Sequence, residues 1–145
     1  MLATVDGYGT AFHAPDDDVT LLFASGDALE QAIANALSDA GLEAKDVDVV
    51  ASGLSGVARF DDEERDAITK ALGRDIAVAA PKQRFFGETL GAGGALATTA
   101  ALAWLSGARV SGLTSGEVPK KVDTVLVTAV GYYGNASAVV VRRAS

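Results

Sequence analysis

Residues 76–106 read IAVAAPKQRFFGETLGAGGALATTAALAWLS, and this stretch decides the fold class. It predicts a short, nearly continuous apolar strand over Ile76 to Ala80, of the kind that is buried on both faces of a sheet. Pro81 ends that strand. Gly91 to Ser106 predicts a helix with no charged residue on any face, and a helix that is apolar all round is buried all round. A buried strand that leads into a buried helix indicates an α/β protein.

The rest of the chain extends this alternation of strands and helices. Asp27, with Glu30 as a capping-box partner, predicts the start of a helix that runs to about Ala40 and ends at Gly41. A second helix is predicted from Asp61 or Asp62 to about Leu72. The other predicted strands are Leu2 to Phe12, Val47 to Ala51, Val122 to Val130 and Ala136 to Arg142, and Ala14 to Asp18 predicts a polar loop. The order βαβαβαββ predicts a largely parallel sheet with helices on its faces.

Composition excludes several classes of function. The chain has 145 residues, which fits one domain, 1–145, and its net charge is −7 with scattered basic residues, so a nucleic-acid partner is not expected. It has no cysteine, which excludes disulfides, thiolate metal sites and a cysteine nucleophile within this chain. We expect no metal, no cofactor, no membrane span and no signal peptide, and we therefore expect a cytoplasmic protein.

Three segments carry a resemblance to a known family. They are residues 36–50, which predict a helix–turn–strand unit; residues 78–95, with Lys82, Gly87 and a glycine-rich helix start; and the loop 131–135. In this order and spacing they resemble the C-terminal half of the β-ketoacyl synthases, over nearly the whole chain. The resemblance implies a thiolase-like half: a five-stranded mixed sheet with helices on both faces.

The chain departs from that family at its two histidines. The family's His-Gly-Thr-Gly-Thr motif aligns with Ser52 to Gly56, and its Gly-His pair aligns with Gly87-Glu88. The resemblance implies that histidines there donate hydrogen bonds to the anions formed in decarboxylation and condensation. Serine donates one weak bond, and an ionised glutamate only accepts. We therefore expect no catalytic residue, with Glu88 acting as a first-turn acid of the following helix.

This pattern resembles chain-length factors, the inactive partners of ketosynthases in polyketide and aryl-polyene systems. The resemblance implies an active ketosynthase or a missing N-terminal half as partner, and contact with an acyl carrier protein. Two alternatives stay open: the C-terminal half of a split condensing enzyme whose cysteine lies on another chain, and an acyl-chain-binding protein. The sequence leaves open polyketide against fatty-acid synthesis, the chain length, and whether the chain is a native half or a fragment.

Three further groups of residues carry expectations. Lys82 is expected to form a structural ion pair with Glu64, although the alignment also allows Glu63. The loop residues could line an acyl pocket, with a packed turn as the alternative: Gly131, Tyr132, Tyr133, Gly134 and Asn135. The apolar helix is expected to face a partner, either a missing half or a second copy of this chain, through Gly93, Gly94, Ala97, Ala101 and Trp104.

Overall fold

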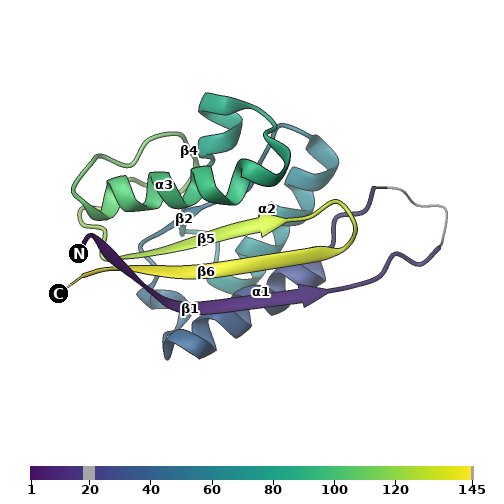
Figure 1. Ribbon diagram of the computed structural model, residues 1–145, viewed down its shortest axis with the longest axis horizontal. Coiled ribbons are helices and arrows are strands. Elements are labelled where there is room, and N and C mark those ends of the chain that lie inside the picture. The colour runs from purple at the N-terminus through teal and green to yellow at the C-terminus, as the bar shows by residue number, and fades with distance from the viewer. Residues whose placement is uncertain (18–21, 145) are drawn as a thin grey trace.

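The chain forms one mixed sheet that lies between helices (Figure 1). The computed structural model describes residues 1–17 and 22–144, so Asp18, at the end of the predicted loop, lies outside the described residues. The strands are β1 (Ala3–Phe12), β2 (Val49–Ala51), β3 (Ala77–Ala79), β4 (Leu113–Ser115), β5 (Thr124–Val130) and β6 (Asn135–Arg143). The helices are α1 (Gly26–Ala40), α2 (Ala58–Leu72) and α3 (Gly93–Leu105), with short helical turns at Ala44–Asp46, Lys82–Phe86 and Leu90–Ala92.

The strand order in the sheet is β1-β6-β5-β2-β3-β4. β2 pairs in parallel with both β3 and β5, whereas β5–β6, β1–β6 and β3–β4 are antiparallel. The predicted mixed sheet is therefore confirmed, but it has six strands rather than five. The missed strand, β4, has only three residues and lies between Gly112 and Gly116, which both have positive φ angles.

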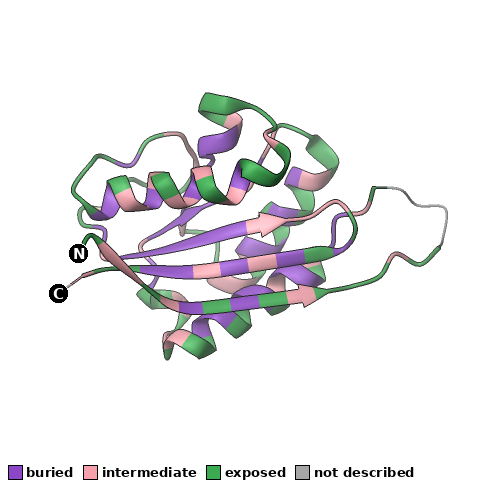
Figure 2. Cartoon of the chain, in the orientation of Figure 1, coloured by how far each residue is buried: buried purple, intermediate pink, exposed green. Residues whose placement is uncertain are grey.

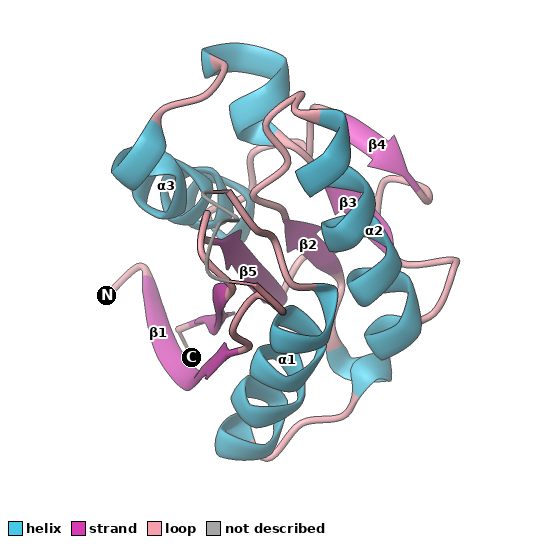
Figure 3. Cartoon of the chain, turned by 90° about the vertical axis from the view of Figure 1, so that its right-hand side faces the viewer, coloured by secondary structure: helices cyan, strands magenta, loops and turns pink. Residues whose placement is uncertain are grey.

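Alternating side chains of the central strands supply two separate cores. Val50 points to the core shared with α1 and α2, while Val49 and Ala51 point to the core shared with α3. This alternation follows from the two-residue period of a strand. Viewed from one end of the sheet, α3 covers one face, and α1 and α2 cover the other (Figure 3).

The helix ends show where local sequence signals were incomplete. Ser25 caps the start of α1, and its hydroxyl accepts a hydrogen bond from the Ala28 amide, so the predicted cap at Asp27 is wrong by two residues. Gly41 ends α1 in the left-handed conformation (φ 65°), as predicted. α2 begins at Ala58, before Asp61, because the Asp61 carboxylate reaches back to the loop that precedes the helix.

Candidate functional site

The candidate site lies where β2, β3 and β5 end. Parallel strands bring their carboxyl ends to one edge of a sheet, and ligand sites of open α/β sheets form at such edges. Ser52 follows β2, Lys82 follows β3, and the loop 131–134 follows β5. The sequence-predicted residues Ser52, Glu64, Lys82, Glu88 and Tyr132 are thus brought to one region, although their side chains have different partners.

Ser52 is fully buried and turned into the sheet. Both its amide and its hydroxyl donate to the Ala79 carbonyl of β3, at 2.8 Å and 2.9 Å. The hydroxyl proton is therefore already used in a backbone contact. Ser52 cannot donate to a reacting oxygen without breaking that bond.

Glu64 is the buried carboxyl of the site. Its side chain comes from α2, is 3% exposed, and accepts hydrogen bonds from the Gly53 amide at 2.7 Å and the Thr128 hydroxyl at 2.6 Å, both through Oε1. Burial raises the pKa of Glu64, and the bonds from Thr128 and Gly53 and the charge of Lys82 offset that rise only in part. Glu63, the alternative from the sequence, instead accepts from the Gly26 amide at the start of α1.

Lys82 pairs with Glu88 rather than with Glu64. Its Nζ lies 3.0 Å from Glu88 Oε2, while Glu88 Oε1 accepts a 2.6 Å hydrogen bond from the Leu90 amide. The expected Lys82–Glu64 ion pair is wrong as a direct contact, because Glu64 is already bonded elsewhere and Glu88 presents a less buried carboxylate. Lys82 still acts on Glu64 through its charge.

Tyr132 completes the surroundings of Glu88. Burial alone would raise the pKa of Glu88, but interactions with the Tyr132 hydroxyl, Lys82 and the Leu90 amide outweigh burial and lower it. Burial, together with the hydrogen-bonding interaction and the charge of Glu88, raises the pKa of Tyr132 to about 12. Glu88 is therefore held as an anion by Lys82, the Leu90 amide and the influence of Tyr132, which a simple first-turn acid would not require.

The two tyrosines of the glycine-rich loop 131–135 differ in their exposure to solvent. The Tyr132 ring packs against Phe60 at a centroid distance of 5.0 Å, whereas Tyr133 is half exposed. Gly134 exchanges backbone hydrogen bonds with His13 and Phe23, and a Cβ there would collide with the His13 carbonyl, so only glycine fits. A packed turn is observed, and an acyl pocket at this loop stays a prediction.

The structure corrects the partner-facing residues of α3. Gly93 lies under Lys82, and Ala97, Ala101 and Trp104 are buried against this chain's own sheet, while Gly94 is half-buried. The outward side of α3 instead carries Ala95, Thr99 and Ala103. A helix without charged residues gives only a weak sequence signal for which of its sides faces inward, so the prediction chose the wrong side.

Asp61 is a site residue whose role the sequence did not show. It is 2% exposed and accepts from the amides of Ser55 and Gly56 at 2.8 Å and 2.9 Å, which fixes the loop after β2. The motif Ser-Gly followed by Asp five residues later was visible. An aspartate in this position also predicts the start of a helix, and that interpretation does not include the bonds from Asp61 to the preceding loop.

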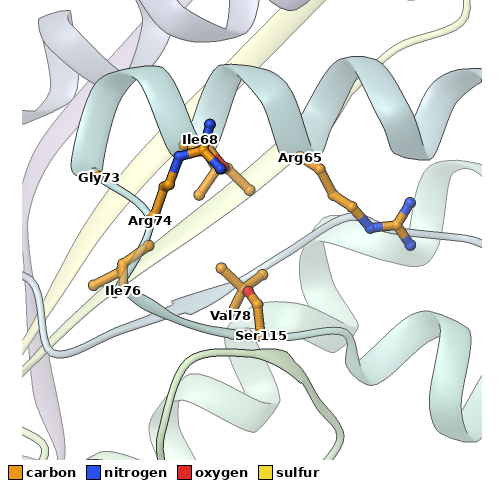
Figure 4. Close-up of a pocket in the computed structure, with 8 residues that line it drawn as sticks. Arg65, Ile68, Gly73, Arg74, Ile76, Val78 and Ser115 are labelled. Carbon is orange, nitrogen blue, oxygen red and sulfur yellow. The ribbon is translucent and has the colours of Figure 1, made fainter.

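Several hollows lie outside this carboxylate region, including one bordered by arginines and one that is apolar. One, of about 240 Å³, lies between α2 and the β3–β4 edge; Arg65 and Arg74 border it, but their side chains extend away from one another and do not converge on a ligand position (Figure 4). The other, of about 280 Å³, is apolar and lies between Phe85, Phe86 and α3. Within residues 1–17 and 22–144, no group of three or more His, Cys, Asp or Glu residues is arranged to hold a metal. In the same described part of the chain, no helix has the length and hydropathy to cross a membrane.

Comparisons with known proteins define the class. The family described as "Beta-ketoacyl synthase, C-terminal domain" matches residues 2–114, which is more than half of the chain. The chain therefore belongs to the β-ketoacyl synthase C-terminal domain family. It is 38% identical to "Actinorhodin polyketide putative beta-ketoacyl synthase 2" of Streptomyces coelicolor (strain ATCC BAA-471 / A3(2) / M145), across 79% of this chain and 32% of that protein.

Solved structures agree on the fold. The ishigamide ketosynthase/chain length factor superposes with a TM-score of 0.81 at 23% identity, covering 99% of this chain and 38% of that chain. A ketosynthase in complex with its chain length factor from Xenorhabdus doucetiae gives 0.81 at 20% identity, with 99% and 40% covered. A type II acyl-carrier protein in complex with its ketosynthase bound to the hexaketide gives 0.81 at 23% identity, with 99% and 39% covered. The chain thus spans about a third of the curated relative's length and about two fifths of these structures' chains.

Proposed function

We propose that this chain is a non-catalytic, chain-length-factor-like part of a ketosynthase system that elongates polyketide, aryl-polyene or fatty-acid-type chains. The observation that carries the proposal is the Glu88 carboxylate bonded to Lys82, at the position that the motif assigns to a family histidine. An oxyanion needs donors aimed at it, and a carboxylate with a lowered pKa is an acceptor that repels a second anion.

Ser52 supports the same conclusion at the other histidine position. Its hydroxyl is directed to the Ala79 carbonyl and is unavailable for an oxyanion. The chain also has no cysteine to hold an acyl group. Neither a nucleophile nor a pair of oxyanion donors is therefore provided by the motif positions of this chain.

A partner is part of the proposal because one side of the sheet is incompletely covered. Val5, Tyr8 and Phe12 of β1 are 68%, 54% and 61% exposed, and their β6 partners Val141, Val139 and Asn135 place them on the α3 side of the sheet. The exposed bands of β1 are visible on the front of the sheet in Figure 2. We infer that 1–145 acts as one domain in the cytoplasm, that a ketosynthase, an N-terminal half or a second copy covers this side, and that an acyl carrier protein delivers the chain.

Turnover of malonyl-loaded carrier protein tests the non-catalytic part. The chain alone is expected to give no decarboxylation or condensation above a blank. Turnover that disappears when Glu88 is replaced would overturn the proposal and favour an enzyme. Co-purification with a second chain that carries a reactive cysteine, together with turnover that depends on Glu88, would favour the split condensing enzyme.

Two substitutions on α3 test the partner surface. Ala103→Glu places a charge on the outward side and should leave the chain folded while weakening assembly in sedimentation. Ala97→Glu buries a charge against this chain's own sheet and should unfold it. If Ala103→Glu is folded and sediments in the same assembly state as the wild type, this side of α3 is not an interface.

A further inference from the structure

Donors from two separate turns bond one carboxylate, and the Tyr132 phenol from a third segment interacts with it electrostatically. Lys82 belongs to the turn Lys82–Phe86, the Leu90 amide opens the turn Leu90–Ala92, and Tyr132 lies in the loop between β5 and β6. Both Glu88 oxygens are used, one by the Lys82 ammonium at 3.0 Å and one by the Leu90 amide at 2.6 Å. An ammonium and an amide that each bond one oxygen of a planar anion form the kind of arrangement that binds a free carboxylate.

Contacts other than Glu88 hold the Lys82 and Tyr132 side chains in place. Lys82 is 9% exposed, and its stem runs over Gly93, where an added Cβ would lie 3.3 Å from Lys82 Cδ and 3.4 Å from Nζ. The absence of a side chain at position 93 therefore leaves room for the lysine. The Tyr132 ring is packed on Phe60. The arrangement should persist when the Glu88 side chain is shortened.

Neither Glu64 nor Asp61, the buried carboxyls among the residues that the structure describes, can replace Glu88 without cost. Glu64 interacts with the charge of Lys82, but it accepts hydrogen bonds from the Gly53 amide and the Thr128 hydroxyl, and burial opposes its ionisation. Asp61 is engaged by the amides of Ser55 and Gly56. Without Glu88, the Lys82 ammonium would be left nearly buried and unpaired, which is unfavourable.

We propose that Lys82, Tyr132 and the Leu90 amide form a carboxylate-binding site that Glu88 fills from within the same chain. While Glu88 occupies it, the site is closed to external ligands that carry a carboxylate. When Glu88 is removed, the site takes a small monocarboxylate such as acetate or formate. This inference concerns the same region as the proposed function but rests on the donors and not on the lack of turnover, so either can fail without the other.

Binding of acetate to Glu88→Ala is the test. Titration followed by calorimetry and by the Leu90 amide resonance should be saturable, with a dissociation constant on the order of 1–20 mM. Chloride at equal ionic strength should not reproduce it. Wild type and the exposed-site control Glu117→Ala should show no saturable binding, and Glu88→Ala combined with Lys82→Met should bind at least about tenfold more weakly.

Several outcomes would overturn the proposal. They are a folded Glu88→Ala that does not bind acetate, binding that survives loss of Lys82, or wild type that binds as well as the variant. Should Glu88→Ala fail to fold, pH titration of the wild-type Leu90 amide gives the answer. Its proton should shift with a midpoint below 4.5, and Glu88→Gln should abolish that shift. If the Leu90 amide proton does not shift with the titration of Glu88, the proposed site does not exist.

Discussion

Glu64 and Glu88 both interact with the charge of Lys82, yet their surroundings drive their pKa values in opposite directions. Glu64 is buried and receives two neutral donors, so burial dominates and its pKa is raised. Glu88 is one-quarter exposed in its side chain and receives an ammonium, a backbone amide and the influence of a phenol, so its pKa is lowered. The difference shows that the number and charge of donors, set against desolvation, decide which carboxyl is the anion.

The largest expected effect comes from removing the buried member of this pair. Glu64→Ala leaves the Gly53 amide and the buried Thr128 hydroxyl without their acceptor, which should lower the free energy of unfolding by about 3 kcal/mol. Urea denaturation measures this loss, with Glu117→Ala as a surface control. A loss equal to that of the control would show that Glu64 does not hold these groups.

The second prediction separates the two carboxyls by pH. A carboxyl with a raised folded pKa contributes stability below its unfolded value near 4.5 and loses it as pH rises through the folded pKa. Glu64→Gln removes this dependence. The stability of Glu64→Gln relative to wild type should therefore increase above pH 4.5, by at most about 1.4 kcal/mol per pH unit.

Denaturation of both proteins between pH 4.5 and pH 8 tests the sign of this change. A flat difference in this range would mean that the pKa of Glu64 is not raised in the folded protein. If the measurement is extended below pH 4.5 and the difference changes only there, the folded protein favours the Glu64 anion, as it favours the Glu88 anion, and the contrast between the two carboxyls would be lost.

The third prediction concerns Glu88, whose dependence has the opposite sign. Its lowered pKa means that its stabilisation is present above 4.5 and is lost as pH falls through the folded pKa. Glu88→Gln should cost about 1 kcal/mol near neutral pH, because the ion pair is partly exposed. The cost should decrease below pH 4.5 in acid denaturation. A cost that is constant with pH would show that the charge of Glu88 is not what stabilises the site.

The sequence predicted the helices and strands that carry these two carboxyls better than it predicted the contacts of their side chains. Hydrophobic periodicity and glycine signals located α1, α2, α3, β1, β5 and β6, since those segments are long enough for a pattern to repeat. β4 was missed because three residues between glycines carry no periodic pattern. The resemblance brought Lys82, Glu64 and Glu88 to one region, and the structure also places them together.

The pairing of Lys82 and the inward side of α3 could not be predicted, for different reasons. The choice between Glu64 and Glu88 depends on desolvation and on amides whose direction only the folded backbone fixes. The inward side of α3 depends on which of its apolar residues meets the sheet, and Ala97, Ala101, Ala95 and Ala103 are chemically identical. Ser52 looked like a weak donor in the sequence, and only its contact with Ala79 shows that its hydroxyl is already used.

The smallest expected effect is a change in the titration of Tyr132 that leaves the fold intact. Its pKa is raised to about 12 first by burial and then by the Glu88 carboxylate, as hydrogen-bond acceptor and as charge. Glu88→Gln removes the charge but not the burial, so the pKa of Tyr132 should fall toward 10 without reaching it. NMR of ring-labelled tyrosine, assigned with Tyr132→Phe, measures this shift. A Tyr132 resonance whose titration is identical in wild type and Glu88→Gln would show that the phenol does not sense Glu88, and would reduce the donors at that carboxylate to Lys82 and the Leu90 amide.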